Sequence, residues 1–384
     1  MLLPTGFGAY VANIGVKDDS DDFVVIAAER AVPAAGVFTR SRFSGPSVSI
    51  SRRHLADGRA RGIVVVSKNA NVATGAEGER DASALLGRVS ERLDCRPSDL
   101  LLASTGVIGR RYPMERVLAG ADAVPRMPSG DNAVRAAQAM MTTDTVPKVA
   151  EAVVGHGPAR VVGIAKGVGM IEPAMATMIA VVLTDAAVEP SPLDVAFRAV
   201  VERTFNCVSV DTDTSTSDTA VVLASGAAGP VDAAEFAAAL GVVGESLTKQ
   251  IARDGEGAET LIEVHVDGAR DAAQAKRVAK AIVNSPLVKT AVHGADPNWG
   301  RVAMAVGKCH DDVDIDQQRV VIRFGDRELY PTAVDETELA RLSEYLRGSE
   351  VRIHVTLHTG AAAATVWGCD LTAGYVRINA DYTT

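Results

Sequence analysis

A threonine near the middle of the chain has the surroundings of a catalytic nucleophile. Residues 166–179 read KGVGMIEPAMATMI, so two glycines and a proline shape a tight turn before the small residue Ala176, and Thr177 opens an apolar run. Cleavage between Ala176 and Thr177 would give Thr177 a free α-amino group, whose ordinary pKa of about 7.7–8.0 suits a general base at neutral pH. Spacing alone favours a plainer interpretation, in which Thr177 is the β-branched first residue of a strand and Lys166 is a solvated strand end.

The elements that must position this segment alternate between strand and helix. Short apolar runs separated by Pro, Gly and Ser at 23–50 predict strands with tight connections. Further strands are predicted at 62–67, 100–103, 160–166, 177–184, 260–266, 318–324, 351–357 and 375–379. A polar turn at 68–71 leads into a helical stretch that continues through about residue 92. Helical spacing is also found at 131–141, 190–205, 231–252 and 271–283. The predicted fold class is α+β, with layered mixed sheets and helices.

Composition and charge limit the classes of function. The 384 residues are 47% apolar and 23% charged, enough to bury a core, but only 4% are aromatic, so small side chains must pack in close layers. A net charge of −9 argues against a nucleic-acid or anionic-membrane surface and favours a small-molecule partner. No signal peptide or membrane span is expected, and four scattered cysteines (Cys95, Cys207, Cys309 and Cys369) indicate reduced thiols and a cytoplasmic location.

A resemblance to a known family gives the threonine segment a definite meaning. The 166–179 segment resembles the self-cleavage motif of the ornithine acetyltransferase (glutamate N-acetyltransferase) family, whose members cut their chain before this Thr. Other segments resemble the family in the same order: 104–109, 141–145, 211–219, 254–257, 296–301 and 375–384. The resemblance therefore spans nearly the whole chain and implies an N-terminal-nucleophile-like fold.

The resemblance also implies roles for individual residues. Thr177 matches the nucleophile, which would take an acetyl group from N-acetylornithine and pass it to glutamate through an acyl-enzyme with ping-pong kinetics. Thr105 and Gly106 match the pair that forms the oxyanion hole, although a Ser-Thr-Gly sequence after a strand also fits a simple turn. Five residues match contacts of the amino-acid substrate: Thr142, Lys166, Glu256, Asn379 and Thr384.

The chemistry of those five residues fits a zwitterionic amino acid. We expect the Lys166 ammonium to bind the substrate α-carboxylate and the Glu256 carboxylate to bind the ornithine δ-ammonium. Without the resemblance, Glu256 would be interpreted as a solvated loop carboxylate, and Asn379 and Thr384 as part of a frayed terminus.

Three departures from the family pattern leave the pathway open. The sequence VSKNANVATG at 66–75 and Glu172 before the proline resemble paralogues encoded with clavulanic acid biosynthesis, and Glu259-Thr260 stands where the family commonly has a lysine.

Alternatives to acetyl transfer from N-acetylornithine are an acyltransferase of secondary metabolism with a different donor, an acetyl-CoA-using bifunctional enzyme, an aminopeptidase or amidase of the N-terminal-nucleophile type, and an uncleaved binding homologue.

No cofactor or metal is predicted. The acidic and hydroxyl residues at 211–218 suggest a calcium loop, but a loop starting at Asp211 would need Gly where Thr216 stands and Glu where Val222 stands. Local hydrogen bonds in turns and caps are the better interpretation. The seven histidines form no recognisable ligand set in the sequence, which leaves spatial pairing open.

Cleavage would divide the chain into an α fragment, residues 1–176, and a β fragment, residues 177–384, that begins with the nucleophile and includes a smaller C-terminal subdomain. The resemblance implies that the fragments stay together as a heterotetramer of two α and two β fragments. The cut falls at a strand and not at a linker, so neither fragment need be a domain.

The intact mass of the purified protein tests the cleavage. We expect two chains of 176 and 208 residues, the second beginning with Thr177, and a single full-length chain for T177A. A wild-type protein that runs as one 40.0 kDa chain would contradict the prediction.

Overall fold

The computed structural model describes residues 1–17, 19–172 and 178–381. The described residues form two compact units. The first unit is drawn from 1–206 and 213–247, and the second from 207–212 and 248–381. The boundary between the units lies elsewhere in the chain than the expected cleavage point, so the fragments expected from cleavage are not the folding units.

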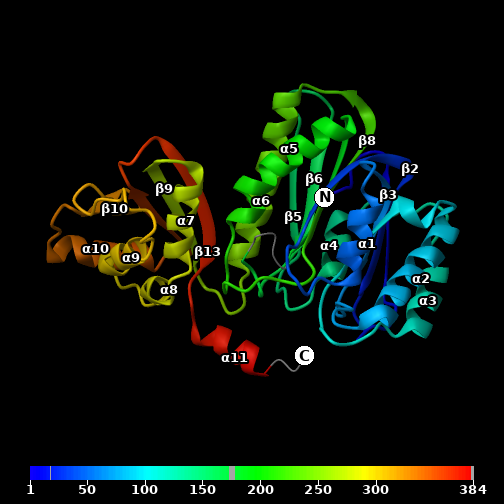
Figure 1. Cartoon of the computed structure of the whole chain (residues 1–384), viewed down its shortest axis with the longest axis horizontal. Coiled ribbons are helices and arrows are strands. Elements are labelled where there is room, and N and C mark those ends of the chain that lie inside the picture. Colours follow the sequence, from blue (N-terminus) through cyan, green and yellow to red (C-terminus); the bar gives the residue numbers. More distant parts are fainter. Residues whose placement is uncertain (18, 173–177, 382–384) are drawn as a thin grey trace. The chain divides into compact units, whose positions relative to one another are not determined.

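The first unit is built on an eight-stranded mixed sheet in the order β4-β3-β2-β8-β7-β6-β5, with β1 paired to β2 (Figure 1). The strands are β1 (Phe7–Ala12), β2 (Phe23–Phe38), β3 (Arg59–Val66), β4 (Leu100–Ser104), β5 (Lys148–Val153), β6 (Arg160–Lys166), β7 (Ile179–Ala187) and β8 (Thr219–Pro230). The pairs β3–β4 and β7–β8 are parallel, and the other pairs are antiparallel.

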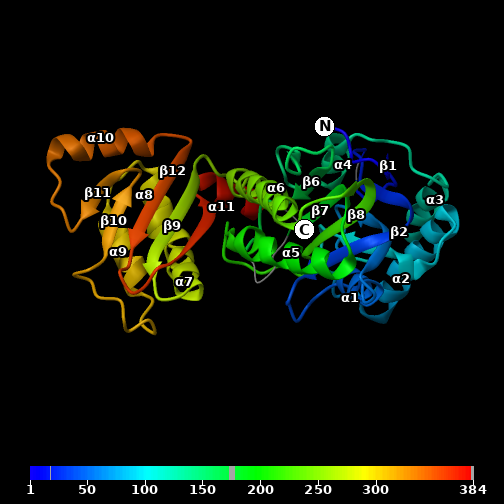
Figure 2. The same ribbon diagram turned by 90° about the horizontal axis from the view of Figure 1, so that it is seen from above.

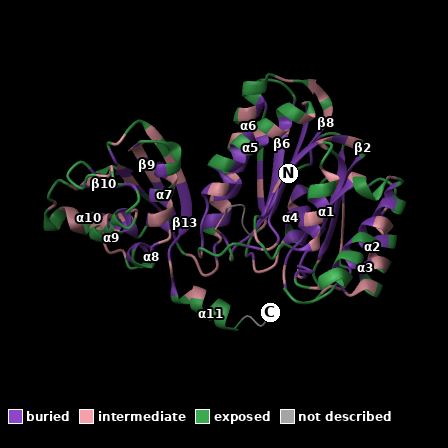
Figure 3. Ribbon diagram, in the orientation of Figure 1, coloured by how far each residue is buried: buried purple, intermediate pink, exposed green. Residues whose placement is uncertain are grey.

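Helices cover both faces of this sheet. They are α1 (Pro46–His54), α2 (Gly75–Leu93), α3 (Met114–Asp122), α4 (Ala133–Met140), α5 (Pro190–Arg203) and α6 (Ala233–Arg253), whose last residues belong to the second unit. Successive residues of one strand supply different cores because side chains alternate across a strand. Phe23 and Val25 pack with α2 and α3, whereas Val24 and Ile26 pack with α4 and with strands β6–β8. Figure 3 shows this layering: the strands are largely buried (purple), and the helices on either side of them carry exposed residues (green).

The structure corrects one prediction in this unit. Residues 23–50 are not a set of short strands: 23–38 form the single strand β2, and 46–54 form helix α1. The first half of β2 pairs mainly with β3 and the second half with β8. A register shift in the β2–β3 pairing between Ala27 and Val32 falls where the apolar run in the sequence is interrupted. Pro46 lies in the first turn of α1, where a missing N–H costs nothing, so the proline begins a helix and does not separate strands.

The second unit contains a five-stranded sheet in the order β11-β10-β12-β9-β13. Its strands are β9 (Leu261–Ala269), β10 (Val321–Phe324), β11 (Arg327–Tyr330), β12 (Glu350–Thr356) and β13 (Ala362–Cys369), and its helices are α7 (Ala272–Val283), α8 (Pro286–His293), α9 (Trp299–Gly307), α10 (Glu336–Leu346) and α11 (Ala373–Asp381). Figure 2 shows α7 beside β9. The buried residues of β9 and β12 alternate with half-exposed or exposed polar ones, so the sheet has one apolar and one polar face.

A second prediction is wrong at the C-terminal end. Residues 375–379, expected as a strand, lie in helix α11, which buries none of its side chains. No strand pairing involves this segment among the described residues, so its backbone satisfies its hydrogen bonds locally in a helix. The helix begins where the N–H of Gly374 donates to Thr372 Oγ1 at 2.9 Å.

Small residues let the layers approach closely, as the composition predicted. A Cβ on Gly163 of β6 would lie 2.6 Å from Val243 Cγ1 and 2.7 Å from Leu247 Cδ1 of α6. A Cβ on Gly62 of β3 would lie 2.2 Å from the carbonyl oxygen of Ile26 in β2.

Substituting Gly62 tests this close packing. We expect G62A to lower the free energy of unfolding by about 1–3 kcal/mol, because the added methyl group meets backbone that cannot move aside cheaply. G87A in helix α2 is the matched control: a Cβ there has no other atom within 4 Å, so the same substitution should be neutral or stabilise by about 0.5–1 kcal/mol. Urea denaturation measures both, and equal effects would contradict the packing argument.

Candidate active site

A buried carboxylate between two lysines forms the centre of the site in the first unit. Asp144 lies just before β5, Lys148 begins β5, and Lys166 ends β6, whose antiparallel pairing with β5 brings the three together. Asp144 Oδ1 lies 2.7 Å from Lys148 Nζ, and Asp144 Oδ2 lies 3.7 Å from Lys166 Nζ. The side chains of Asp144 and Lys148 are fully buried, and that of Lys166 is 4% exposed.

Backbone donors complete the shell of Asp144. The N–H of Gly167 donates to Oδ1 at 2.7 Å, and the N–H of Thr142 donates to Oδ2 at 3.0 Å. Burial acts to raise the pKa of Asp144, but the charges of Lys166 and Lys148 and the hydrogen bonds from Lys148 and Gly167 outweigh it and hold the pKa well below its usual range. Asp144 is therefore an anion that fixes both lysines and does not exchange protons near neutral pH.

Lys166 also reaches the predicted oxyanion residues. Its Nζ donates to Thr105 Oγ1 at 3.5 Å, and Thr105 is only 3% exposed. Thr105 directly follows β4, and Gly106 has a φ of +127°, where a Cβ would lie 2.2 Å from the carbonyl carbon of Lys68. Only glycine fits this approach. The structure thus brings together four of the predicted residues, Thr105, Gly106, Thr142 and Lys166, from three separate segments.

The predicted nucleophile and cleavage site, Thr177 and Ala176, lie outside the described residues. The strand that follows them is placed beside Lys166, because Ile179 of β7 pairs with Lys166 of β6. On the N-terminal side of the predicted cleavage site, the N–H of Glu172 donates to the carbonyl oxygen of Asp213 at 2.9 Å. Glu172 and Ile179 are therefore both held by the first unit.

Asp218 is a residue that the sequence analysis missed. It is fully buried, and its Oδ1 accepts a hydrogen bond of 2.8 Å from the N–H of Met178, the residue directly after Thr177. Burial raises the pKa of Asp218 well above its usual range, against the effect of the Met178 hydrogen bond. The predicted local bonds exist nearby, as when the N–H of Ser217 donates to Ser215 Oγ, but Asp218 bonds across 40 positions in the chain. Its one signal in the sequence is an aspartate directly before a buried apolar run.

Two further predicted residues lie together in the second unit. Asn379 Nδ2 donates to Glu256 Oε2 at 2.9 Å, so helix α11 is joined to the 254–257 turn. Glu256 lines a pocket of about 180 Å³ with Asp211, Lys289 and Tyr375, among others. Glu256 is therefore not a solvated loop carboxylate alone. The remaining predicted residue, Thr384, lies outside the described residues.

Comparisons with known proteins identify the family of the chain. The model of the ArgJ family matches residues 8–384. A protein of Streptomyces clavuligerus named glutamate N-acetyltransferase Oat2 is 56% identical over 99% of this chain and 98% of its own length. The arginine biosynthesis bifunctional protein ArgJ 2 of a Nostoc species is 54% identical over 99% of this chain and 98% of its own length.

A solved structure extends the comparison to the fold. The crystal structure of arginine biosynthesis bifunctional protein ArgJ from Bacillus halodurans is 43% identical, with a TM-score of 0.50, over 53% of this chain and 98% of the solved chain. The protein is an α+β protein of mixed sheets and helices, and it shares the fold of that ArgJ chain over the part that matches. The chain belongs to the ArgJ family.

Removing the Asp144 charge tests the centre of the site. We expect D144N to lower the free energy of unfolding by about 3–5 kcal/mol at pH 7, because it leaves two buried ammonium groups without their counter-charge. D194N is the matched control, since Asp194 pairs with Arg198 on the surface and its loss should cost about 0.5 kcal/mol or less.

The pH dependence of the same variant has a defined sign. The pKa of Asp144 is depressed in the folded state, so its stabilisation is complete above the unfolded pKa of about 3.9 and is lost as the pH falls below that value. The difference in stability between wild type and D144N should therefore narrow on acidification, as urea denaturation at pH 3 and pH 7 would measure. A constant difference would contradict the charge argument.

Proposed function

We propose that the protein transfers the acetyl group of N2-acetyl-L-ornithine to L-glutamate. The observation that carries the proposal is the meeting of Thr105, Gly106 and Lys166 beside the strand that follows Thr177. Membership of the ArgJ family and 56% identity to a named glutamate N-acetyltransferase support the same activity. The protein is an acyltransferase of amino-acid biosynthesis.

The mechanism we propose begins with hydrolysis of the Ala176–Thr177 peptide bond, in which one water is consumed, Ala176 becomes a carboxylate and Thr177 gains a free α-amino group. The freed α-amino group of Thr177 takes the proton of its own hydroxyl as Oγ attacks the acetyl carbonyl carbon. The Thr105 hydroxyl and the Gly106 N–H donate to the oxyanion of the tetrahedral intermediate. The C–N bond to ornithine then breaks, the ornithine nitrogen takes the proton, and an acetyl ester on Thr177 remains. The amine of glutamate attacks that ester, and Thr177 Oγ leaves with the proton.

The surroundings of Thr105 support its place in this scheme. Lys166 Nζ already donates to Thr105 Oγ1, so the threonine hydroxyl hydrogen is left to point elsewhere, as an oxyanion donor requires. The Lys166 ammonium adds a positive charge that is held in a buried position by Asp144. A buried cation stabilises developing negative charge more than a solvated one does.

Substrate recognition follows the charges of a zwitterionic amino acid. Lys166 is proposed to bind the α-carboxylate and Thr142 to line the same region, because both are joined to Asp144. Glu256, with its partner Asn379, is proposed to bind the side-chain ammonium of ornithine, and Thr384 to contact the substrate.

Cleavage also has support from a relative. The solved Bacillus halodurans chain matches over nearly its whole length but corresponds to about half of this protein, as a fragment of a cleaved chain would. We propose that the two fragments of this protein assemble as a heterotetramer. None of the four cysteines, all of which lie among the described residues, forms a disulfide. We propose a cytoplasmic location, where thiols stay reduced. No helix among the described residues has the length and apolar character needed to cross a membrane.

Other acyl acceptors and donors define the alternatives. Water as acceptor would make the protein a hydrolase or aminopeptidase. A different donor would place it in secondary metabolism. A bifunctional enzyme that also uses acetyl-CoA as donor is a further alternative, and two of the relatives are named bifunctional proteins.

An acetyl-transfer assay separates these activities. With N-acetylornithine as donor, we expect rapid release of ornithine only when glutamate is present, together with an equal amount of N-acetylglutamate. T177A should lower turnover by more than about 10³-fold because it removes the nucleophile. T105V should lower it by about 10²–10³-fold, and T105S, which keeps the hydroxyl, should retain most of it. Equal release of ornithine without glutamate would contradict acetyl transfer and favour the hydrolase.

A further inference from the structure

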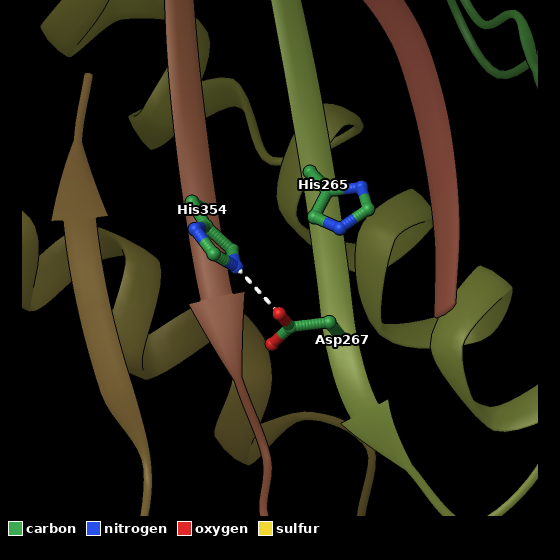
Figure 4. Close-up of side chains that lie close together, drawn as sticks. All are labelled: His265, Asp267 and His354. Atoms are coloured by element: carbon green, nitrogen blue, oxygen red, sulfur yellow. Dashed lines mark ion pairs between the residues drawn. The ribbon is translucent and has the colours of Figure 1, made fainter. Parts of the chain in front are cut away.

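Two histidines and an aspartate meet on the polar face of the sheet in the second unit. Strands β9 and β12 run parallel with His265 directly opposite His354, and Asp267 lies two residues further along β9 on the same face. Figure 4 shows His354 pointing across the two strands toward Asp267. None of these three residues takes part in the proposed acetyl transfer.

The side-chain atoms of this cluster lie close enough together to hold one ion between them. One ligand atom from each of the three residues lies within 4.8 Å of those from the other two. His354 Nε2 and Asp267 Oδ2 are 3.0 Å apart. Two ligands of a tetrahedral Zn²⁺ ion lie about 3.3 Å apart, given bonds of about 2.0–2.1 Å.

The His354–Asp267 contact leaves one buried atom of each residue without an aligned hydrogen bond. His354 Nε2 and Asp267 Oδ1 are both buried, and neither finds a hydrogen-bond partner within the part of the chain that the structure describes. The short approach of Nε2 to Oδ2 is therefore not aligned as a hydrogen bond. Buried polar atoms without partners are rare in proteins and call for a missing ligand, water or ion.

A neighbouring strand orients the second imidazole. Thr365 of β13 is opposite His265 in the register, and Thr365 Oγ1 lies 2.9 Å from His265 Nδ1. This contact occupies one ring nitrogen and leaves Nε2 of His265 for a ligand, which is the arrangement found around metal-binding histidines.

We propose that His265, His354 and Asp267 bind a divalent cation of the zinc class. Two imidazoles and one carboxylate favour Zn²⁺ and similar transition metals over Mg²⁺ or Ca²⁺, which prefer all-oxygen sites. Three protein ligands leave a fourth position for water. Arg323 is the residue opposite His354 on the neighbouring strand β10. It donates to Thr356 Oγ1 at 3.1 Å and to Glu328 Oε2 at 3.4 Å, so its charge is paired with the Glu328 carboxylate.

Zinc binding by the full-length, untagged protein tests this site. After removal of metal with a chelator, titration of Zn²⁺ against a chromophoric competitor should show about one ion bound per chain. H265Q and H354Q should each weaken binding by more than about 100-fold, since each removes a ligand. T365V should weaken it by about 10–100-fold, because Thr365 only orients His265.

Matched histidine variants serve as controls. H310Q changes an exposed histidine outside the cluster and should leave zinc affinity unchanged. H293Q changes a second group, formed by Glu259, His293 and Asp370. In that group both oxygens of Asp370 have partners: Oδ2 lies 3.1 Å from His293 Nδ1, and Oδ1 accepts from the N–H groups of Glu259 and Thr260. H293Q should therefore also leave zinc affinity unchanged. Circular dichroism checks that every variant folds.

Cobalt gives an independent signal. Co²⁺ bound by two histidines and a carboxylate in a four-coordinate site should give a strong visible absorption band that is lost in H354Q and kept in H310Q. Failure of the wild type to bind Zn²⁺, or equal affinity in wild type, H265Q and H354Q, would overturn the proposal and leave a simple ion pair between His354 and Asp267. Neither result bears on acetyl transfer.

Discussion

The ionised Asp144 carboxylate is the constraint on which the candidate active site depends. A buried anion is stable only with counter-charges and donors, and Asp144 has two ammonium groups and two backbone N–H groups around it. These partners come from the 142–144 turn, β5 and the end of β6. The ion pair with Asp144 positions the Lys166 ammonium, and Lys166 Nζ in turn donates a hydrogen bond to Thr105 Oγ1.

The strand order of the first unit places the remaining parts of the site. β7 lies between β6 and β8, so the chain that leaves Thr177 passes beside Lys166 on one side and the start of β8 on the other. Asp218, just before β8, then holds the N–H of Met178. Two buried carboxylates thus have opposite tasks: Asp144 stays charged among cations, whereas burial raises the pKa of Asp218 and favours its neutral form.

Regular elements with strong periodicity were predictable from the sequence, and irregular ones were not. The apolar run at 160–166 and the helical spacing at 231–252 match β6 and α6 closely, because a continuous apolar run and a 3.6-residue apolar period are both visible within a short stretch of sequence. The long strand β2 was predicted as several pieces because its partner changes from β3 to β8, which no local pattern shows. The segment at 375–379 alternates like a strand but finds no strand to pair with among the described residues, and it forms α11.

The sequence by itself determined which functional groups are available and in what order they occur. They are a threonine after a small residue, a Ser-Thr-Gly turn and a lysine at a strand end, within the order of motifs that the family shares. Only the tertiary structure decided which of these groups meet. Lys166 and Thr105 are 61 positions apart, and His265 and His354 come together across parallel strands that are distant in sequence. The physical reason is that hydrophobic periodicity is local and specifies elements, whereas pairing of charges and ligands depends on sheet order and register, which the folded chain alone sets.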